Sequence, residues 1–363
     1  MADLSRVQTK IERIMNGRDN PGAMTIPLAF AEALYRSGVN IRNFLFDRGV
    51  FKTLHAPCKV ISVGAITIGG AGKTPFVKLI ANRLKDKKPG ILSRGYKGEF
   101  KTDIHVVSDG YTLGDAPPVS ADEPYMLARS LKGIPVVCAP ERIKGAKKIV
   151  ELGAGVIILD DGFGSRAIAR DLNILILDAK NPFGQAKRLF PRGVLREPKE
   201  NIIRADLIVV ATSDDISDEK FGEAKKAIKR YAKDHAPIIS VAGTITGFTD
   251  IYGAPQAPPS GPVAAFCGVA GPERFYGSLE KLGHDVAGII SFPDHHRFNA
   301  ADIAAVAEKA KASGARFIVT TEKDAVRLLN FSDAFNVPLL SATYETRLTR
   351  GEEILDRALA ALF

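Results

Sequence analysis

Residues 59–74 constrain the fold more than any other stretch of the chain, and they read KVISVGAITIGGAGKT. The first part, Lys59–Ile66, is a short apolar run rich in β-branched residues, which is typical of a buried parallel strand. Glycines follow, then Lys73 and Thr74, and then apolar residues at helical spacing from Phe76 onward. The order strand, glycine-rich loop, Lys-Thr and helix is that of a phosphate-binding P-loop.

The residue types of this loop explain its chemistry. Glycines let the backbone wrap closely enough for several N–H groups to point at one anion, and the N-terminus of the following helix adds partial positive charge. We expect Lys73 to reach the β- and γ-phosphates and Thr74 to hold Mg²⁺. The alternative is an ordinary glycine-rich turn, which the Lys-Thr pair at the correct offset disfavours. The predicted nucleotide-binding residues are Thr67, Ile68, Gly69, Gly70, Ala71, Gly72, Lys73 and Thr74.

Composition is typical of a globular protein with a sizeable core. Of the 363 residues, 45% are hydrophobic and 25% are charged, and a chain of this length suggests two domains. The cysteines, Cys58, Cys138 and Cys267, are far apart and odd in number. They form no metal-type pair and indicate a reducing, cytosolic compartment. We recognise no signal peptide and no apolar run of membrane-spanning length.

The chain carries a formal net charge of +9, which fits an anionic partner such as nucleic acid, an acidic membrane surface or a phosphorylated substrate. Much of this charge lies in residues 180–204, where seven side chains are basic and two are acidic. Because this stretch is far from the termini in sequence, we interpret it as part of a site rather than as a tail. Its length is typical of functional loops.

The N-terminal region predicts helices with apolar faces. A helix over Thr25–Ser37 would align Ile26, Phe30 and Leu34, and Gly38 would end it. A second short helix is expected over Ile41–Asp47, with arginines beside its apolar residues. Such helices suit an anionic membrane surface. From the residues alone, the slightly favoured interpretation is that they cover the core of the first domain.

After the P-loop, apolar strands alternate with helical segments, which indicates an α/β fold with a mostly parallel sheet covered by helices on both faces. We predict an N-terminal P-loop domain over residues 1–235 and a second, smaller α/β domain over 236–363, with a hinge near 230–262, where a Pro- and Gly-rich loop lies. The predicted strands are Gly90–Ser93, His105–Ser108, Pro135–Ala139, Val156–Asp160, Asn173–Asp178, Leu207–Ala211, Val263–Val269, Val286–Ser291, Phe317–Thr321 and Val337–Ser341. The predicted helices are Asp122–Leu131, Glu141–Leu152, Ser213–Asp234, Glu273–Leu282, Asp302–Ala312 and Glu352–Leu362.

Several strand ends and helix starts carry polar residues suited to phosphoryl transfer. Asp160 and Asp161 follow an apolar strand, where P-loop proteins place a carboxylate near Mg²⁺. Asp122 opens a helix, where it either complements the helix dipole or accepts a hydroxyl proton. His295 follows a strand beside Asp294, either as an oriented base or as an ordinary surface residue. Arg94 and Tyr96 also follow a strand, at the sheet edge where ligands bind, and Arg192, Arg196 and Glu197 lie in the basic loop.

Taken together, the motifs GGAGKTP, SRGY, DEPYML, LDDGF, LREP, AGPERF, FPDHHRF and TTEKDAVRL resemble the tetraacyldisaccharide 4'-kinase family, in family order from about residue 25 to 350. The resemblance implies two α/β/α domains around a cleft. It also implies transfer of the γ-phosphoryl group of ATP to the 4'-hydroxyl of an acylated glucosamine disaccharide 1-phosphate, giving lipid IVA in lipid A biosynthesis. This reaction would take place peripherally, at the cytoplasmic face of the inner membrane of a Gram-negative bacterium.

Residue by residue, the resemblance implies that Lys73 and Thr74 bind nucleotide phosphates and Mg²⁺, and that Asp160 and Asp161 lie near the metal. Asp122 corresponds to the proposed catalytic base and His295 to the histidine that supports it, acting together across the interdomain cleft, with Asp294 orienting the imidazole. Glu197 corresponds to an acid that we place with the metal ligands. The predicted substrate-binding residues are Arg94, Tyr96, Arg192 and Arg196.

The chain departs from the common pattern at a few positions. Thr67 stands where P-loops usually have Gly, Ala65 where the family often has Asn, and Gly164 and Ser165 where it often has Gln-His. These changes affect local contacts around the nucleotide or sugar and leave the P-loop lysine and the carboxylates in place.

Two other classes of protein remain as alternatives. A P-loop GTPase or metallochaperone is suggested by the sequence Thr-Glu-Lys-Asp at 321–324, although its lysine is displaced by one place from the guanine-reading pattern and Ile68 replaces the extra lysine of related loops. A nucleic-acid-binding ATPase is suggested only by the basic charge, without a recognised binding motif. We therefore expect a monomer that binds the acylated disaccharide and an anionic membrane surface, and no nucleic acid.

Overall fold

The computed structural model describes residues 2–70, 72–212 and 216–363. Its backbone packing divides the chain into two compact units. The first unit comprises Met1–Lys73, Val156–Ala242 and Leu348–Phe363, and the second comprises Thr74–Gly155 and Gly243–Arg347. The predicted hinge region contains one of the points where the chain passes between them. The predicted domains, 1–235 and 236–363, stay a prediction.

The first unit contains a parallel sheet in the order β8-β7-β6-β1-β5. Its strands are mostly apolar and are buried along nearly their whole length, as expected of a parallel sheet that helices cover. Ile61 of β1 lies between Ile158 of β5 and Leu172 of β6. The strand bounds are β1 Lys59–Gly64, β5 Val156–Asp160, β6 Leu172–Asp178, β7 Leu207–Thr212 and β8 Ile238–Thr249. Only the first residues of β8, up to Ala242, belong to this unit.

In the second unit, β10, β11, β12 and β13 form a parallel group in the order β11-β10-β12-β13. In a second group, β2 pairs with β4 in parallel and β4 with β3 antiparallel. The bounds are β2 Pro89–Ser93, β3 His105–Ser108, β4 Val136–Cys138, β9 Pro255–Gln256, β10 Val263–Cys267, β11 Val286–Ser291, β12 Phe317–Thr321 and β13 Leu339–Arg350. The mostly parallel α/β fold predicted from the sequence is confirmed.

Strand β10 shows how side-chain alternation places helices on both faces of the sheet. Successive residues of a strand point to opposite faces. Val263, Ala265 and Cys267 therefore pack with helix α7 (Pro272–Lys281), whereas Ala264 and Phe266 pack with helix α8 (Ala300–Ala312). The run of five apolar residues is buried throughout, as two-sided covering requires.

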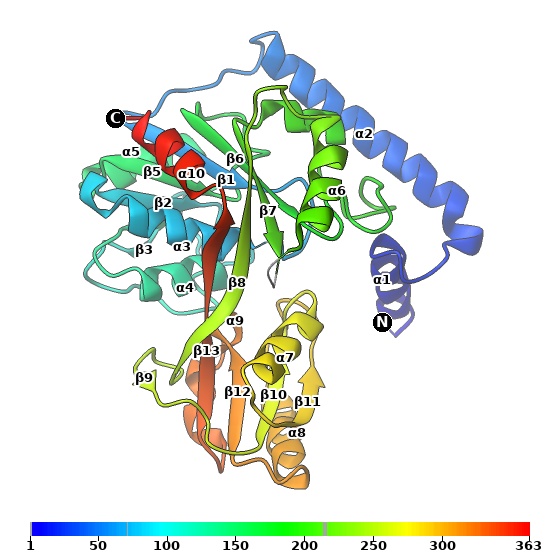
Figure 1. Cartoon of the computed structure of the whole chain (residues 1–363), viewed down its shortest axis with the longest axis vertical. Helices are drawn as coiled ribbons and strands as arrows, with labels where there is room; N and C mark the ends of the chain where they lie inside the picture. The colour runs from blue at the N-terminus through cyan, green and yellow to red at the C-terminus, as the bar shows by residue number, and fades with distance from the viewer. Residues whose placement is uncertain (1, 71, 213–215) are drawn as a thin grey trace. The chain divides into compact units, whose positions relative to one another are not determined.

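The other helices of the first unit are α1 Ala2–Met15, α2 Thr25–Asp47, α6 Asp218–Lys229 and α10 Glu352–Ala360, with short 3₁₀ helices η1 Gly22–Met24 and η3 Lys199–Arg204. Helix α6 packs onto this sheet through Ala224 and Ile228, beside β7 (Figure 1). Those of the second unit are α4 Asp122–Ser130, α5 Arg142–Glu151 and α9 Glu322–Ala325, with η2 Lys85–Lys87 and η4 Leu329–Ala334. Helix α3, Lys73–Arg83, begins at the last residue of the first unit's opening segment.

The prediction of two N-terminal helices separated at Gly38 is wrong, because α2 is one uninterrupted helix (Figure 1). A glycine ends a helix by adopting a left-handed conformation, and Gly38 is not among the residues with positive φ. The helical spacing instead continues through it on the inner face, where Leu28, Glu32, Val39 and Asn43 are buried.

Three other elements differ from the predictions. Strand β8 spans Ile238–Thr249, inside the predicted hinge region 230–262, and its glycines weaken the strand signal. Strand β13 continues to Arg350, well beyond the predicted end at Ser341. Helix α6 begins only at Asp218, after Ser217 caps it by accepting from the Lys220 N–H. Residues 213–215 of the predicted helix lie outside the described residues. The remaining predicted strands and helices are confirmed within a few residues.

Among the helices that the structure describes, none combines the length and apolarity that a membrane span would need.

Candidate active site

The predicted P-loop connects β1 to α3. Gly69 and Gly72 have φ values of 105° and 78°, a region that favours glycine, so the loop needs glycine at these places. The basic loop braces the P-loop: the Ile68 N–H donates to the Val194 carbonyl at 2.7 Å, and the Arg196 N–H donates to the Ile66 carbonyl at 2.7 Å. Thr67 pairs with Leu195 in an isolated bridge. The predicted residue Ala71 lies outside the described residues.

Asp160 and Asp161 lie at the carboxyl end of β5, as predicted. Asp160 is buried and is aligned with Val63, which lies one residue before the end of β1. Asp161 adopts a left-handed conformation with φ of 52°. This turn directs its carboxylate toward Arg196, whose two terminal nitrogens donate to it at 2.6 and 2.7 Å. The Lys73 ammonium lies 3.8 Å from the same carboxylate. Lys73, Asp161 and Arg196 therefore gather beside the P-loop.

The basic loop is itself anchored to the inner face of α2. The Tyr35 hydroxyl donates to the Arg196 carbonyl at 3.0 Å. Glu32 accepts from the Leu189 N–H at 3.1 Å and lies 3.6 Å from Arg192. Buried polar groups need hydrogen-bond or ion-pair partners, and the polar side chains on the inner face of α2 find them in backbone groups and an arginine of the basic loop. Helix α2 therefore supports the loop that braces the P-loop.

Glu197, predicted as a metal ligand, has a different environment. Its buried carboxylate accepts from Arg42 of α2 through Oε1, and from Arg204 at 2.6 Å and Asn201 through Oε2. Both oxygens are therefore occupied by protein donors. This geometry favours a role for Glu197 in joining α2 to the basic loop over a role as metal ligand.

Asp122 and His295, 173 residues apart in sequence, are in contact. Asp122 is the first residue of α4, and its Oδ2 lies 3.2 Å from Nδ1 of His295. Both side chains are well shielded from solvent. The two residues belong to the second unit, so their contact is formed within one compact unit.

The charges around Asp122 favour its ionised form. Burial acts to raise the pKa of its carboxyl, but the hydrogen bond from His295 and the charge of Arg327 outweigh burial and lower the pKa overall. The Arg327 Nε lies 3.5 Å from Oδ2. Asp122 is therefore a carboxylate at neutral pH, which is the form that can accept a proton.

Lys323 of α9 occupies the other side of the imidazole. Its ammonium lies 3.1 Å from Nε2 of His295, 3.1 Å from Glu123 and 3.2 Å from Asp294. Burial acts to lower the pKa of Lys323, but the two carboxylates raise it overall. Asp294 is 4.0 Å from Nε2, so it holds Lys323 more closely than it holds His295. His295, Glu123 and Asp294 therefore surround the ammonium of Lys323. The guanine-reading interpretation of residues 321–324 does not account for these contacts.

A buried carboxylate fixes the turn that carries His295. Asp324 is fully buried and accepts from the Gly268 N–H at 3.1 Å, from the Thr321 hydroxyl at 2.6 Å and from Arg327 at 2.8 Å. The His295 N–H in turn donates to the Gly268 carbonyl at 3.2 Å. His295 has φ of 60°, a strained conformation that such a frame can maintain.

The predicted substrate-binding residues lie in different places. Tyr96 is exposed, and its ring meets that of His295 edge-on with centroids 6.1 Å apart. Arg94 is exposed near Tyr96 in sequence. Arg192 and Arg196 belong to the first unit, where they pair with Glu32 and Asp161. Tyr96 therefore lies beside the Asp122–His295 pair, whereas Arg196 and the P-loop lysine lie beside the same carboxylate, that of Asp161.

Sequence reasoning singled out the segment that contains Lys323 but assigned no site role to Lys323 or Arg327. The available signal was position, because residues 322–327 directly follow β12, and carboxyl ends of parallel strands carry functional residues.

A P-loop with its lysine near a strand-end aspartate is typical of enzymes that bind nucleotides and transfer or hydrolyse their phosphoryl groups. The family model "Tetraacyldisaccharide-1-P 4'-kinase" matches residues 24–363. The tetraacyldisaccharide 4'-kinase of Anaeromyxobacter dehalogenans (strain 2CP-C) is 41% identical over 354 residues, covering 94% of this chain and 93% of that protein. The one from Syntrophus aciditrophicus (strain SB) is 39% identical, covering 81% and 82%. A crystal structure of LpxK from Aquifex aeolicus in complex with ATP matches with a TM-score of 0.72 at 31% identity, covering 92% of this chain and 97% of that one. The chain belongs to the tetraacyldisaccharide 4'-kinase family and is a kinase.

Proposed function

We propose that this chain transfers the γ-phosphoryl group of ATP to the 4'-hydroxyl of a tetraacyldisaccharide 1-phosphate, which yields the 4'-phosphorylated lipid A precursor lipid IVA. The observation that carries the proposal is the Asp122–His295 contact at 3.2 Å. A P-loop alone occurs in many nucleotide hydrolases and switches. A shielded carboxylate held by an imidazole is what an alcohol acceptor requires in addition, because its hydroxyl must lose a proton.

The P-loop supplies the electrostatic part of the reaction. Backbone N–H groups of Gly69, Gly70 and Gly72 and the N-terminus of α3 are suited to the phosphate oxygens. Lys73 neutralises charge on the β- and γ-phosphates as the bond to the leaving ADP breaks. Arg196 and Lys73 both face Asp161, so two cations share this one carboxylate before nucleotide binds. Phosphoryl transfer depends mainly on such positioning and neutralisation.

The residues present suit Mg²⁺. Thr74 and Asp160 offer a hydroxyl and a carboxylate oxygen, which are ligand types that Mg²⁺ prefers, and one or two carboxylates plus substrate phosphates are the usual set. Both oxygens of Asp161 accept from Arg196, so Asp161 would lie beside the ion. Within residues 2–70, 72–212 and 216–363, no three His, Cys, Asp or Glu side chains form a metal cluster, so the phosphates would complete the coordination. When bound, the ion would neutralise phosphate charge, while Arg196 holds Asp161 in place.

Asp122 acts as the general base in this proposal. The 4'-oxygen attacks the γ-phosphorus, the bond from that phosphorus to the bridging oxygen of ADP breaks, and the hydroxyl proton passes to the carboxylate of Asp122. Because Oδ2 is engaged by His295, Oδ1 is the oxygen left to receive the proton. Tyr96, exposed beside His295, and Arg94 would contact the sugar.

Lys323 positions the histidine. A charged ammonium can only donate a hydrogen bond, so at 3.1 Å the Nε2 atom of His295 must accept. The imidazole proton then lies on Nδ1 and is donated to Asp122. This tautomer keeps the carboxylate of Asp122 ionised and oriented. A single hydrogen bond ties Asp122, the proposed base, to His295, which is itself held in place.

Helix α2 is suited to a membrane surface. The side chains of Ile26, Phe30, Leu34, Ile41 and Phe44 share one face and are between 53% and 81% exposed, opposite the inner face that holds the basic loop. The alternative that these side chains cover the core does not fit such exposure. We propose that this face docks peripherally on the anionic cytoplasmic leaflet of the inner membrane, where the lipid acceptor resides, and that the protein acts as a monomer without nucleic acid.

The direct test is an assay of γ-phosphate transfer from ATP to purified tetraacyldisaccharide 1-phosphate, with the product identified by mass. We expect product with the wild-type protein and a loss of at least about a hundredfold for Lys73→Ala. Lys311→Ala, an exposed lysine of the second unit, serves as the matched control and should keep full activity. Near-normal turnover of Lys73→Ala would exclude the nucleotide assignment, and absence of any transfer by folded wild-type protein would exclude the proposed acceptor.

A further inference from the structure

A hollow in the first unit, separate from the P-loop, is rimmed by basic side chains. Arg36 of α2, Lys187 and Arg188 of the basic loop, and Lys199 of η3 line it, together with Glu200 and Tyr231. Its floor includes the buried residues Leu189 and Leu195. Segments that are far apart in sequence thus bring four cations and one carboxylate to a single concave place.

These cations are poorly compensated by the protein itself. Within the described part of the chain, Arg36, Lys187 and Arg188 form no ion pair with a carboxylate, whereas the neighbouring Arg192 pairs with Glu32. Lys199 lies over the ring of Phe183 at 5.2 Å instead of beside an acid. Basic residues that converge without acidic partners create a positive potential that attracts an anion.

Lys199 responds to this environment. Burial lowers the pKa of its ammonium, and the charges of Lys187, Arg188 and Arg36 lower it further, against the opposing effect of Glu200. An anion bound among these side chains would relieve that repulsion. The hollow is therefore suited to a compact, multiply charged group such as phosphate.

The neighbourhood of the hollow identifies the molecule that carries the phosphate. Arg36 belongs to α2, whose outer face exposes the apolar stripe Ile26, Phe30, Leu34, Ile41 and Phe44. Phe190, next to the hollow in sequence, is also partly exposed and packs edge-on against Tyr35 of α2. A phosphate held here thus belongs to a molecule whose apolar part can meet α2.

We propose that this hollow binds the phosphate group of a phosphorylated lipid. Two lipids share that chemistry, the acceptor with its 1-phosphate and an anionic phospholipid of the membrane. The first source rests on the proposed function, whereas the second does not. Either way, the site would hold the lipid beside α2 by a charge-assisted contact that the apolar stripe alone does not provide.

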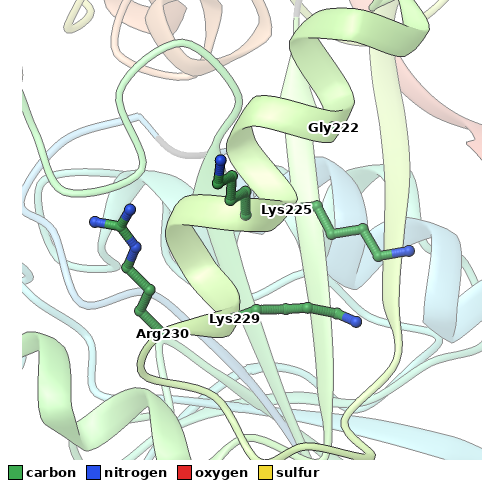
Figure 2. A pocket seen from close by; sticks show the side chains of 5 residues that line it. Gly222, Lys225, Lys229 and Arg230 are labelled. Atoms are coloured by element: carbon green, nitrogen blue, oxygen red, sulfur yellow. The ribbon is translucent and has the colours of Figure 1, made fainter.

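A second basic hollow provides the control. It runs along α6 and is lined by Gly222, Lys225, Lys226, Lys229 and Arg230 (Figure 2). Its cations come from α6 and from Arg230, which directly follows α6, so they do not converge on a site built from several segments. Removing two charges here changes the net charge of the same unit by the same amount without altering the proposed site.

The experiment compares Arg36→Gln/Lys199→Gln with Lys225→Gln/Lys229→Gln. In one arm, transfer to tetraacyldisaccharide 1-phosphate is measured in neutral detergent micelles. In the other arm, cosedimentation is measured with phosphatidylcholine vesicles with and without phosphatidylglycerol. If the site takes the 1-phosphate, the first variant raises KM for the lipid acceptor about tenfold or more, with KM for ATP unchanged. If it takes a headgroup, the same variant loses affinity only for the phosphatidylglycerol vesicles.

The control double variant should match the wild type in the micelle arm and change vesicle binding far less than the site variant. Equal effects of the two double variants would show that net charge alone matters and would overturn the proposal, as would wild-type behaviour of Arg36→Gln/Lys199→Gln in both arms. Failure of the wild type to phosphorylate the lipid would count against the proposed function instead, since the vesicle arm does not depend on it. Circular dichroism melts confirm that each variant is folded.

Discussion

Nε2 of His295 and the ammonium nitrogen of Lys323 lie 3.1 Å apart. Glu123 and Asp294 hold Lys323 in its charged form, so the lysine donates and the imidazole accepts. The proton of a neutral His295 must then lie on Nδ1, facing Asp122. One lysine thereby determines which ring nitrogen supports the carboxylate that we propose as the base.

Lys323→Met should free Nε2 and allow the imidazole to exchange between tautomers. We expect kcat to fall about 10- to 100-fold, since general-base catalysis contributes about 10²–10⁴ and the variant leaves the base itself in place. KM for ATP should stay unchanged. Nitrogen-15 spectra of histidine-labelled protein should show His295 with its proton on Nδ1 in the wild type and a mixture in the variant. Lys323→Arg should restore part of kcat.

Lys311→Met is the matched control for that measurement and should leave both the spectra and the kinetics unchanged. A raised KM for the lipid with normal kcat in Lys323→Met would show that the lysine contacts substrate rather than positioning His295. The wild-type tautomer in that variant would likewise contradict the positioning role.

Asp122 and His295 should behave as one unit. Asp122→Asn and His295→Ala should each lower kcat by about 10²–10⁴, while KM for ATP changes little because neither residue is placed at the nucleotide. The double variant should lose much less than the product of the two losses. Strictly multiplicative losses in this double-mutant cycle would mean that the residues act independently despite their contact.

The lowered pKa of Asp122 has a consequence for stability in acid. A carboxyl whose pKa is lower in the folded than in the unfolded state stabilises the fold above its ordinary pKa, and this contribution disappears as pH falls through the lowered value. The groups facing Asp122 are His295, Arg327 and Lys323. In urea unfolding, the wild type should exceed Asp122→Asn in stability near pH 6, and the difference should shrink below the ordinary carboxyl range. A difference that is constant with pH would show that the carboxylate charge is not stabilising.

The parts of this site that could be predicted from the sequence are those whose signal lies within a short stretch of neighbouring residues. The P-loop, the strand that ends in Asp160 and the helix start at Asp122 are local patterns of spacing and residue type, and the structure places each as expected. The Asp122–His295 contact came from a resemblance, because no local pattern joins residues 173 positions apart.

Other features depended on tertiary partners. The family resemblance places Glu197 with the metal ligands, and only the approach of Arg42 from α2 and of Arg204 from η3 shows that its oxygens are occupied. Gly38 reads as a helix end, but the packing of Val39 and Asn43 against the first unit keeps α2 continuous. In the sequence, Lys323 suggests only part of a guanine-reading pattern, whereas the fold places Glu123 and Asp294 around it.

The partners of Glu197 predict a stability effect. Glu197→Ala should destabilise the first unit by about 3 kcal/mol, because it leaves Arg204 largely buried without its counterion. Glu197→Gln should cost less, since an amide oxygen still accepts one hydrogen bond. Chemical denaturation measures both, and titration with Mg²⁺ and a non-hydrolysable ATP analogue should show unchanged metal affinity. A variant of normal stability with weakened Mg²⁺ binding would restore the role as metal ligand.

The two faces of α2 predict opposite outcomes for the same kind of substitution. Phe30, Leu34 and Phe44 are each more than half exposed, so replacing all three with Ser should change the thermal midpoint little. It should strongly weaken cosedimentation with anionic vesicles, because each apolar side chain contributes at most about 1.5–3 kcal/mol when buried in the interface. Val39→Ser on the inner face is the matched control. Val39 is 8% exposed, so this variant should lower the melting temperature, while the protein that remains folded should still bind vesicles. If the triple variant unfolds, or if it binds vesicles as well as the wild type does, the exposed face of α2 is not the membrane-docking surface.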